Sequence, residues 1–130
     1  MLKLAELKAG DTVRIEDEGI TREGTIVDIS REEKQVLINN GVQEFWYDLD
    51  QVHPIPLSDE QLTRLGFVKE VDGSSVKYMK GPFRMVILND DFSDIEMWYR
   101  EDRRHFNSPI GIHHLQNLYL DMTKVPLEMP

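Results

Sequence analysis

The chain has 130 residues, 40% of them hydrophobic and 30% charged, which is typical of a globular protein and allows one domain or two small units packed together. Its formal charge of −9 disfavours nucleic acid and anionic membranes as partners, because both repel an acidic protein. The absence of cysteine excludes a disulfide framework, a thiolate nucleophile and cysteine-ligated metal sites.

No apolar run reaches the roughly 18 residues of a membrane-spanning helix, and the N-terminal segment MLKLAELKAGD has no long apolar core. We therefore expect a cytoplasmic protein without a membrane partner. The acidic charge is uneven, since residues 1–57 carry 6 Lys and Arg against 12 Asp and Glu, whereas residues 58–130 carry 9 against 12. The oligomeric state is left open by these observations.

Short strands separated by turns are predicted in residues 1–57. Turn residues and alternation place them at Val13–Ile15, Thr25–Ile29, Gln35–Ile38 and Val42–Tyr47, with Asn40-Gly41 as the strongest hairpin signal. Val27 and Ile29, like Val36 and Ile38, have the two-residue spacing that puts both side chains on one face of a strand. We expect these four side chains to line a core.

The segment after Tyr47 predicts a turn at Asp48–Val52 and then an extended edge strand at His53–Leu57, because Pro54 and Pro56 restrict the backbone. This order of strands, turn and last strand resembles SH3-like barrels of the KOW or Tudor kind. The resemblance implies a small β-barrel over residues 1–57.

Residues 58–130 predict a second unit, which begins with a helix capped by Ser58 and stopped by Gly66. Four strands are then predicted at Phe67–Val71, Val76–Met79, Arg84–Leu88 and Ile95–Tyr99, separated by turn residues. Met85–Leu88 is apolar on both faces and predicts the central, most buried strand. The fold class is therefore α+β, an SH3-like barrel packed against a helix, an antiparallel sheet and a closing helix.

The closing helix is predicted at Ile112–Thr123, where apolar residues recur every three or four positions. The segments Pro54–Leu57, Leu65–Phe67 and Leu115–Tyr119 resemble a family of uncharacterised small proteins from gut anaerobic bacteria and their phages or mobile elements, which typically end in a His-x-Leu-Gln-Asn-Leu-Tyr helix. The resemblance carries no activity. The family's usual Gly and acidic continuation is replaced here by Lys124-Val125-Pro126.

Two polar clusters suggest cation sites. His113 and His114 could join His105 or His53 around a metal ion, but neighbouring helical residues point about 100 degrees apart, so a packing or helix-start role is favoured. The acidic loop from Asn89 to Glu96 fails the EF-hand template, because Phe92 and Ile95 occupy positions that need an oxygen ligand and Gly. We predict no metal and no cofactor.

The candidate interaction surface consists of two tryptophans and a basic cluster. Alternation places Trp46 beside Glu44 and Asp48, and Trp98 beside Glu96 and Arg100, so each indole shares a strand face with charged residues. Burial between the two units is favoured over an exposed partner site, although Trp is enriched at binding hot spots. The cluster Arg100, Arg103 and Arg104 is interrupted by Glu101 and Asp102 and is predicted as a solvated loop, with an anion-binding edge as the alternative.

No catalytic motif such as GxSxG, HExxH, a P-loop or GxGxxG is present, so we predict no enzyme. The favoured function is a non-catalytic module that binds a protein partner. A nucleic-acid-associated SH3-like barrel and an acidic inhibitor that mimics DNA, with Glu16-Asp17-Glu18 beside Glu32-Glu33, are the alternatives.

Overall fold

The computed structural model describes residues 2–88 and 92–130, which divide into two compact units. Unit 1 comprises Met1–Ile55 and Gly111–Asn117, and unit 2 comprises Pro56–Ile110 and Leu118–Pro130. The sequence analysis grouped residues 111–117 with the second unit, whereas here they belong to unit 1. The units consist of antiparallel sheets and a few helices, which confirms the α+β class.

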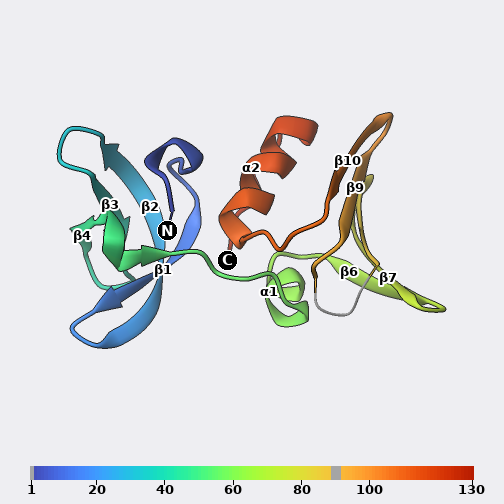
Figure 1. The fold of residues 1–130 in the computed structure, drawn as a ribbon, viewed down its shortest axis with the longest axis horizontal. Helices are drawn as coiled ribbons and strands as arrows, with labels where there is room; N and C mark the ends of the chain where they lie inside the picture. Colours follow the sequence, from blue (N-terminus) through green and yellow to red (C-terminus); the bar gives the residue numbers. More distant parts are fainter. Residues whose placement is uncertain (1, 89–91) are drawn as a thin grey trace. The chain divides into compact units, whose positions relative to one another are not determined.

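Unit 1 contains one five-stranded sheet in the order β4-β3-β2-β1-β5 (Figure 1). Its elements before residue 55 are η1 (Leu4–Glu6), β1 (Thr12–Asp17), β2 (Ile20–Ser30), β3 (Gln35–Asn39), β4 (Glu44–Asp48), η2 (Leu49–Gln51) and β5 (Val52–His53). The first four strands form a meander, and the 3₁₀ turn η2 returns the chain so that β5 pairs with β1. Strands β4 and β5 stay at opposite edges, so the described sheet does not close.

Strand β2 is longer than the predicted Thr25–Ile29, so Gly24 lies inside it and not in a turn. The turn lies instead at Glu18 and Gly19, which have φ angles of 53° and 78°. A Cβ on Gly24 would lie 2.3 Å from Cγ2 of Ile38, so this position requires Gly for space.

The prediction that Val27 lines the core was wrong. The register between β2 and β3 shifts between Ile26 and Asp28, so Val27 is the extra residue of a β-bulge. Ile26 is therefore buried and Val27 is 39% exposed, while Ile29 returns to the core face and is partly buried there. The two-residue spacing of Val27 and Ile29 could not predict this difference, because a bulge interrupts the alternation of faces between them.

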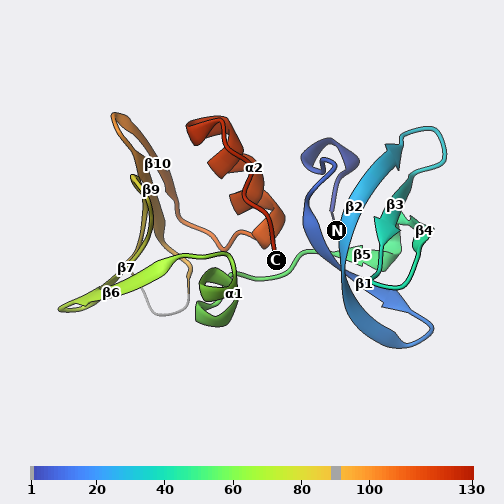
Figure 2. The ribbon, with the colours of Figure 1, turned by 180° about the vertical axis from the view of Figure 1, so that it is seen from behind.

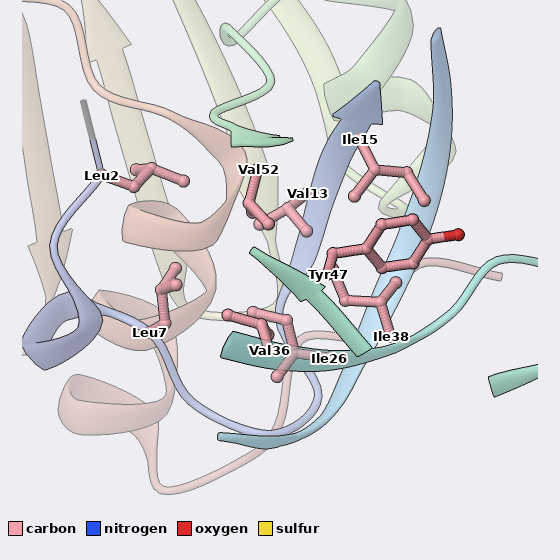
Figure 3. Packing of buried hydrophobic residues seen from close by; sticks show 9 residues of the cluster. All are labelled: Leu2, Leu7, Val13, Ile15, Ile26, Val36, Ile38, Tyr47 and Val52. Atoms are coloured by element: carbon pink, nitrogen blue, oxygen red, sulfur yellow. The ribbon is translucent and has the colours of Figure 1, made fainter. Parts of the chain in front are cut away.

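The core of unit 1 is a cluster of nine buried side chains from the sheet and the N-terminal segment (Figure 3): Leu2, Leu7, Val13, Ile15, Ile26, Val36, Ile38, Tyr47 and Val52. The predicted core positions Val36 and Ile38 are both fully buried. Tyr47 buries its ring, while its hydroxyl donates to Oδ2 of Asp17 at 3.1 Å and accepts from Nδ2 of Asn40 at 2.9 Å. The one polar atom of this large side chain is thus satisfied.

Unit 2 contains a second sheet, in which five strands follow one another in the order β10-β9-β8-β7-β6 (Figure 2). Its elements are α1 (Asp59–Arg64), β6 (Val68–Asp72), β7 (Ser75–Lys80), β8 (Phe83–Ile87), β9 (Ile95–Tyr99) and β10 (Asp102–Phe106). Strand β10 was missed, because its charged residues favour a loop. It pairs with β9 from Asp102 to Phe106.

Strand β8 is central, as predicted, but it is not buried on both faces. Phe83, Met85 and Ile87 are buried, whereas Val86 is half-buried and Leu88 is 43% exposed. On the buried face, the Phe83 ring lies 6.0 Å from the Phe67 ring and 4.9 Å from the Tyr119 ring. The apolar run Met85–Leu88 therefore predicted the central strand correctly, but it did not mean that both faces of this strand are buried.

Helix α1 begins as predicted, because Oγ of Ser58 accepts the Gln61 N–H at 3.2 Å. The Gln61 side chain accepts from Nη1 of Arg64 at 3.1 Å, so it bonds along the helix and not back to the cap. Gly66 follows with a φ of 92°, the conformation expected at a helix stop.

Helix α2 (Ile112–Thr123) has the predicted bounds, and the unit boundary falls inside it, between Asn117 and Leu118. Its first half bonds to unit 1. The N–H of Ile112 donates to the carbonyl of Ile55 at 2.8 Å, and Gln116 accepts from the Thr12 N–H at 2.7 Å and donates to Thr12 Oγ1 at 3.2 Å. Neither described helix is long and apolar enough to cross a bilayer.

Asn117 completes this set by donating to the Glu6 carbonyl at 3.1 Å and to Oδ2 of Asp11 at 3.2 Å. Asp11 is buried, and its burial raises the pKa of its carboxyl from 3.8 to about 6, against the opposing effects of the Lys8 N–H, Asn117 and the charges of Lys8 and His114. The ionised form of Asp11 therefore costs stability in unit 1.

We predict that a fragment of residues 1–57 does not reach the native fold of unit 1. In this fragment the buried Thr12 amide loses its acceptor on Gln116, and the Asp11 carboxylate loses its donor on Asn117. A Gly-Ser linker that joins residue 57 to residues 111–123 should restore the fold, since Ile112 N lies 2.8 Å from the Ile55 carbonyl. Amide NMR spectra of both fragments check this. A dispersed spectrum of residues 1–57 that matches the intact protein would contradict it.

We also predict that Asp11→Asn gains stability relative to the wild type as pH rises from about 4 to about 7. The native carboxyl binds its proton more tightly than the unfolded one, so the wild type loses stability as Asp11 ionises. The difference in unfolding free energy should shift by roughly 2 kcal/mol in favour of the variant. Urea unfolding at both pH values measures it, and an unchanged difference would contradict the burial of the charge.

Candidate functional site

The strongest candidate surface is the outer face of the sheet in unit 2. The strand register places five side chains in one line across the five strands, which we call the Trp98 face: Val68, Met79, Arg84, Trp98 and Arg103. The core side chains Phe83, Met85 and Ile87 alternate with these positions and occupy the other face. Val68 is 65% exposed, so this line presents apolar surface next to guanidinium groups.

Trp98 is the centre of this face. It is half-buried, and Cζ of Arg103 lies 3.8 Å from the centre of its ring, which is a cation–π contact. Beside it is a surface hollow of about 340 Å³, lined by Pro82, Arg84, Trp98 and Arg100. The hollow combines one indole with two guanidinium groups that can donate paired hydrogen bonds to a carboxylate.

The arginines of the predicted basic cluster divide between the two faces of the sheet. Arg104 lies on the core-side face, where it contacts Oδ2 of Asp102 at 3.0 Å and Oδ2 of Asp121 at 2.9 Å. These carboxylates raise its pKa and occupy its guanidinium. Arg103 points to the Trp98 face. Within residues 2–88 and 92–130, no carboxylate pairs with Arg84, Arg100 or Arg103.

Trp46 belongs to unit 1 and Trp98 to unit 2. Trp46 lies on β4 opposite Leu37 and is 39% exposed. Sequence reasoning missed Arg84 and Pro82. The signal for Arg84 was available, since alternation puts it on the outer face of a strand whose alternate residues are apolar.

A second cluster lies in unit 1, where Glu6, His113 and His114 bring their ligand atoms within 4.8 Å of one another. Glu6 was not among the residues that the sequence pointed to. His105 contacts Asp94, and Nε2 of His53 lies 3.7 Å from Glu16, so neither completes the His113-His114 pair. Asn89, Asp90 and Asp91 of the predicted acidic loop lie outside the described residues.

Comparisons with protein-family models, curated proteins and solved structures found no match to this chain. The resemblance to small proteins of gut anaerobes and their mobile elements therefore stays a prediction. The functional argument has to come from the chemistry of the two clusters.

We predict that both tryptophans contribute less to stability than a core aromatic residue does. Trp46→Ala should cost less than about 1 kcal/mol, since surface changes are small, and Trp98→Ala about 1–2 kcal/mol, since its ring is half-covered. Phe83→Ala, at a fully buried site, should cost about 3–5 kcal/mol. Urea unfolding followed by circular dichroism compares them. A core-sized loss for Trp46→Ala would mean that a further segment covers this indole.

Proposed function

We propose that the chain is a non-catalytic module that binds an acidic segment of a partner protein on the Trp98 face. The observation that carries this proposal is the position of Trp98 among three arginines that have no carboxylate partner among the described residues, beside a hollow that Arg84 and Arg100 line. Tryptophan and arginine are the residue types most enriched at binding hot spots. The hollow has the size of a small ligand pocket and fits one or two side chains of a partner.

Charge complementarity supports an acidic partner segment. The chain as a whole carries −9, so three arginines that pair with no carboxylate of the described residues are unusual on one face, and they can attract an approaching carboxylate. The contrast with Arg104 is informative, because two aspartates neutralise it on the opposite face. The apolar neighbours Val68 and Met79 would cover hydrophobic side chains that flank the acidic residue.

Nucleic acid is the alternative occupant, since a base can stack on an indole that carries an arginine. The net charge opposes this alternative, because every phosphate approaches an acidic protein. For unit 1 we propose an SH3-like topology. Its support is the four-strand meander, followed by the 3₁₀ turn η2 and a last strand that pairs with β1.

The expected result is that Trp98→Ala and the double variant Arg84→Glu/Arg103→Glu each weaken binding of an Asp- and Glu-rich peptide by at least about tenfold, as loss of a hot spot does. NMR titration of the full chain with this peptide should shift amides of β8, β9 and β10. Trp46→Ala is the matched control, because it removes a side chain of the same type, at an exposed position, from the other unit. It should bind like the wild type.

Parallel capture from a nuclease-treated lysate extends the test to natural partners. Retention of the same proteins by wild type and Trp98→Ala would contradict the assignment of this face. Tight binding of single-stranded oligonucleotides that is lost with Arg84→Glu/Arg103→Glu would replace the protein partner by nucleic acid. Equal peptide affinity in all variants would remove the Trp98 face as the site.

A further inference from the structure

His113 is a buried histidine without a hydrogen-bond partner. Its side chain is 0% exposed, and neither Nδ1 nor Nε2 has a partner among the residues that the structure describes. A Cβ on Gly111 would lie 3.0 Å from Nδ1 of His113 and from Cβ of Pro54, so the ring is packed tightly against the chain. Buried polar atoms are normally bonded, and an exception of this kind calls for an absent ligand.

The neighbours of His113 supply two further ligand atoms. Its ring centre lies 4.2 Å from the ring of His114, and Nε2 of His114 lies 2.9 Å from Oε2 of Glu6. All three ligand atoms fall within 4.8 Å of one another. The three residues belong to unit 1, so the cluster does not depend on unit 2.

We propose that Glu6, His113 and His114 form a binding site for a divalent cation of the zinc class. Two imidazole nitrogens and one carboxylate oxygen are a donor set that zinc takes together with a water in the fourth position. The chain contains no cysteine, so thiolates do not compete for the metal. Carboxylate and imidazole without thiolate also accept Co²⁺, which provides a spectroscopic probe.

The surroundings hold the carboxylate in place for this role. Oε1 of Glu6 accepts the Lys3 N–H at 2.8 Å, which leaves Oε2 directed at His114. Nδ2 of Asn117 fixes the Glu6 backbone to α2 through a 3.1 Å bond to its carbonyl. Such outer contacts orient metal ligands and raise affinity.

The pKa values support neutral imidazole and ionised carboxylate near neutral pH. Burial, together with the charge of His114, lowers the pKa of His113 from 6.5 to about 4, against the opposing effect of Glu6. Burial opposes ionisation of Glu6, but the bonds from Lys3 and His114 outweigh it and leave the Glu6 pKa below its usual value. Both ligands are thus in the form that binds a metal.

Metal binding requires two local changes. Ligand atoms around tetrahedral zinc lie roughly 3.3 Å apart, so the three side chains must rotate inward from their present spacing. Nε2 of His114 must give up its bond to Glu6 to bind the metal, so the ring proton has to lie on Nδ1 and the 3.4 Å contact from the Gly111 N–H to Nδ1 must open. Binding therefore fixes one tautomer of His114.

Untagged full-length protein, stripped with a chelator, tests the site by calorimetry with Zn²⁺ and by visible absorption with Co²⁺. We expect one equivalent of Zn²⁺ and a tetrahedral Co²⁺ spectrum. Glu6→Gln and His114→Gln should each weaken binding by at least about tenfold, because a ligand is lost. His105→Gln, which removes an exposed histidine of unit 2, is the control and should bind normally.

His113→Gln should also lose binding, and its amide NMR spectrum shows whether it still folds. If it does not fold, the Glu6 and His114 variants decide the question. No heat of binding, or a zinc affinity unchanged in both Glu6→Gln and His114→Gln, would overturn the proposal. Loss of binding only in His105→Gln would assign the metal to another surface. These outcomes are independent of the Trp98 face.

Discussion

The bonds of Gln116 to Thr12 are the constraint on which unit 1 depends, because they join residues 104 positions apart in a buried site. Gln116 carries donors and an acceptor, so burying it without partners would cost more than most apolar contacts return. Its oxygen accepts the amide of Thr12 at the start of β1. The pairing therefore fixes the position of the first half of α2 within unit 1.

Other features of unit 1 follow from this position. Once Gln116 is placed, Asn117 reaches the backbone of Glu6 and the carboxylate of Asp11. The same helical turn carries His113 and His114 to Glu6. The polar cluster around His113, whose ring nitrogens have no partner among the described residues, therefore follows from the position that the bonds of Gln116 give to this helical turn.

The parts of the fold that local chemistry decides were predictable from the sequence. The cap at Ser58, the stop at Gly66 and the bounds of α2 depend on residues within a few positions of each other. Long-range packing decided the rest. The bulge at Val27 and the close approach at Gly24 depend on β3, and β10 exists because β9 offers it an edge.

The candidate sites show the same limit. Alternation correctly put Trp98 on a face with charged residues, but only the register of five strands showed which arginines lie beside it. Counting charges grouped Arg103 with Arg104, although one stacks on an indole and the other is paired with aspartates. Glu6 lies more than a hundred residues from the histidines, and no spacing rule connects it to them.

Unit 1 is built from two separate segments of the sequence, and this affects the order in which the chain becomes structured during synthesis. A ribosome releases the chain from its N-terminus, and domains that are continuous in sequence fold as they emerge. Here β1 to β5 emerge first, yet Gly111–Asn117 must follow before unit 1 is complete. The strands β6 to β10 emerge in between. All strands of the unit 2 sheet have therefore been synthesised before unit 1 is complete. The growing chain therefore carries an unfinished unit 1 until residues 111–117 have left the ribosome.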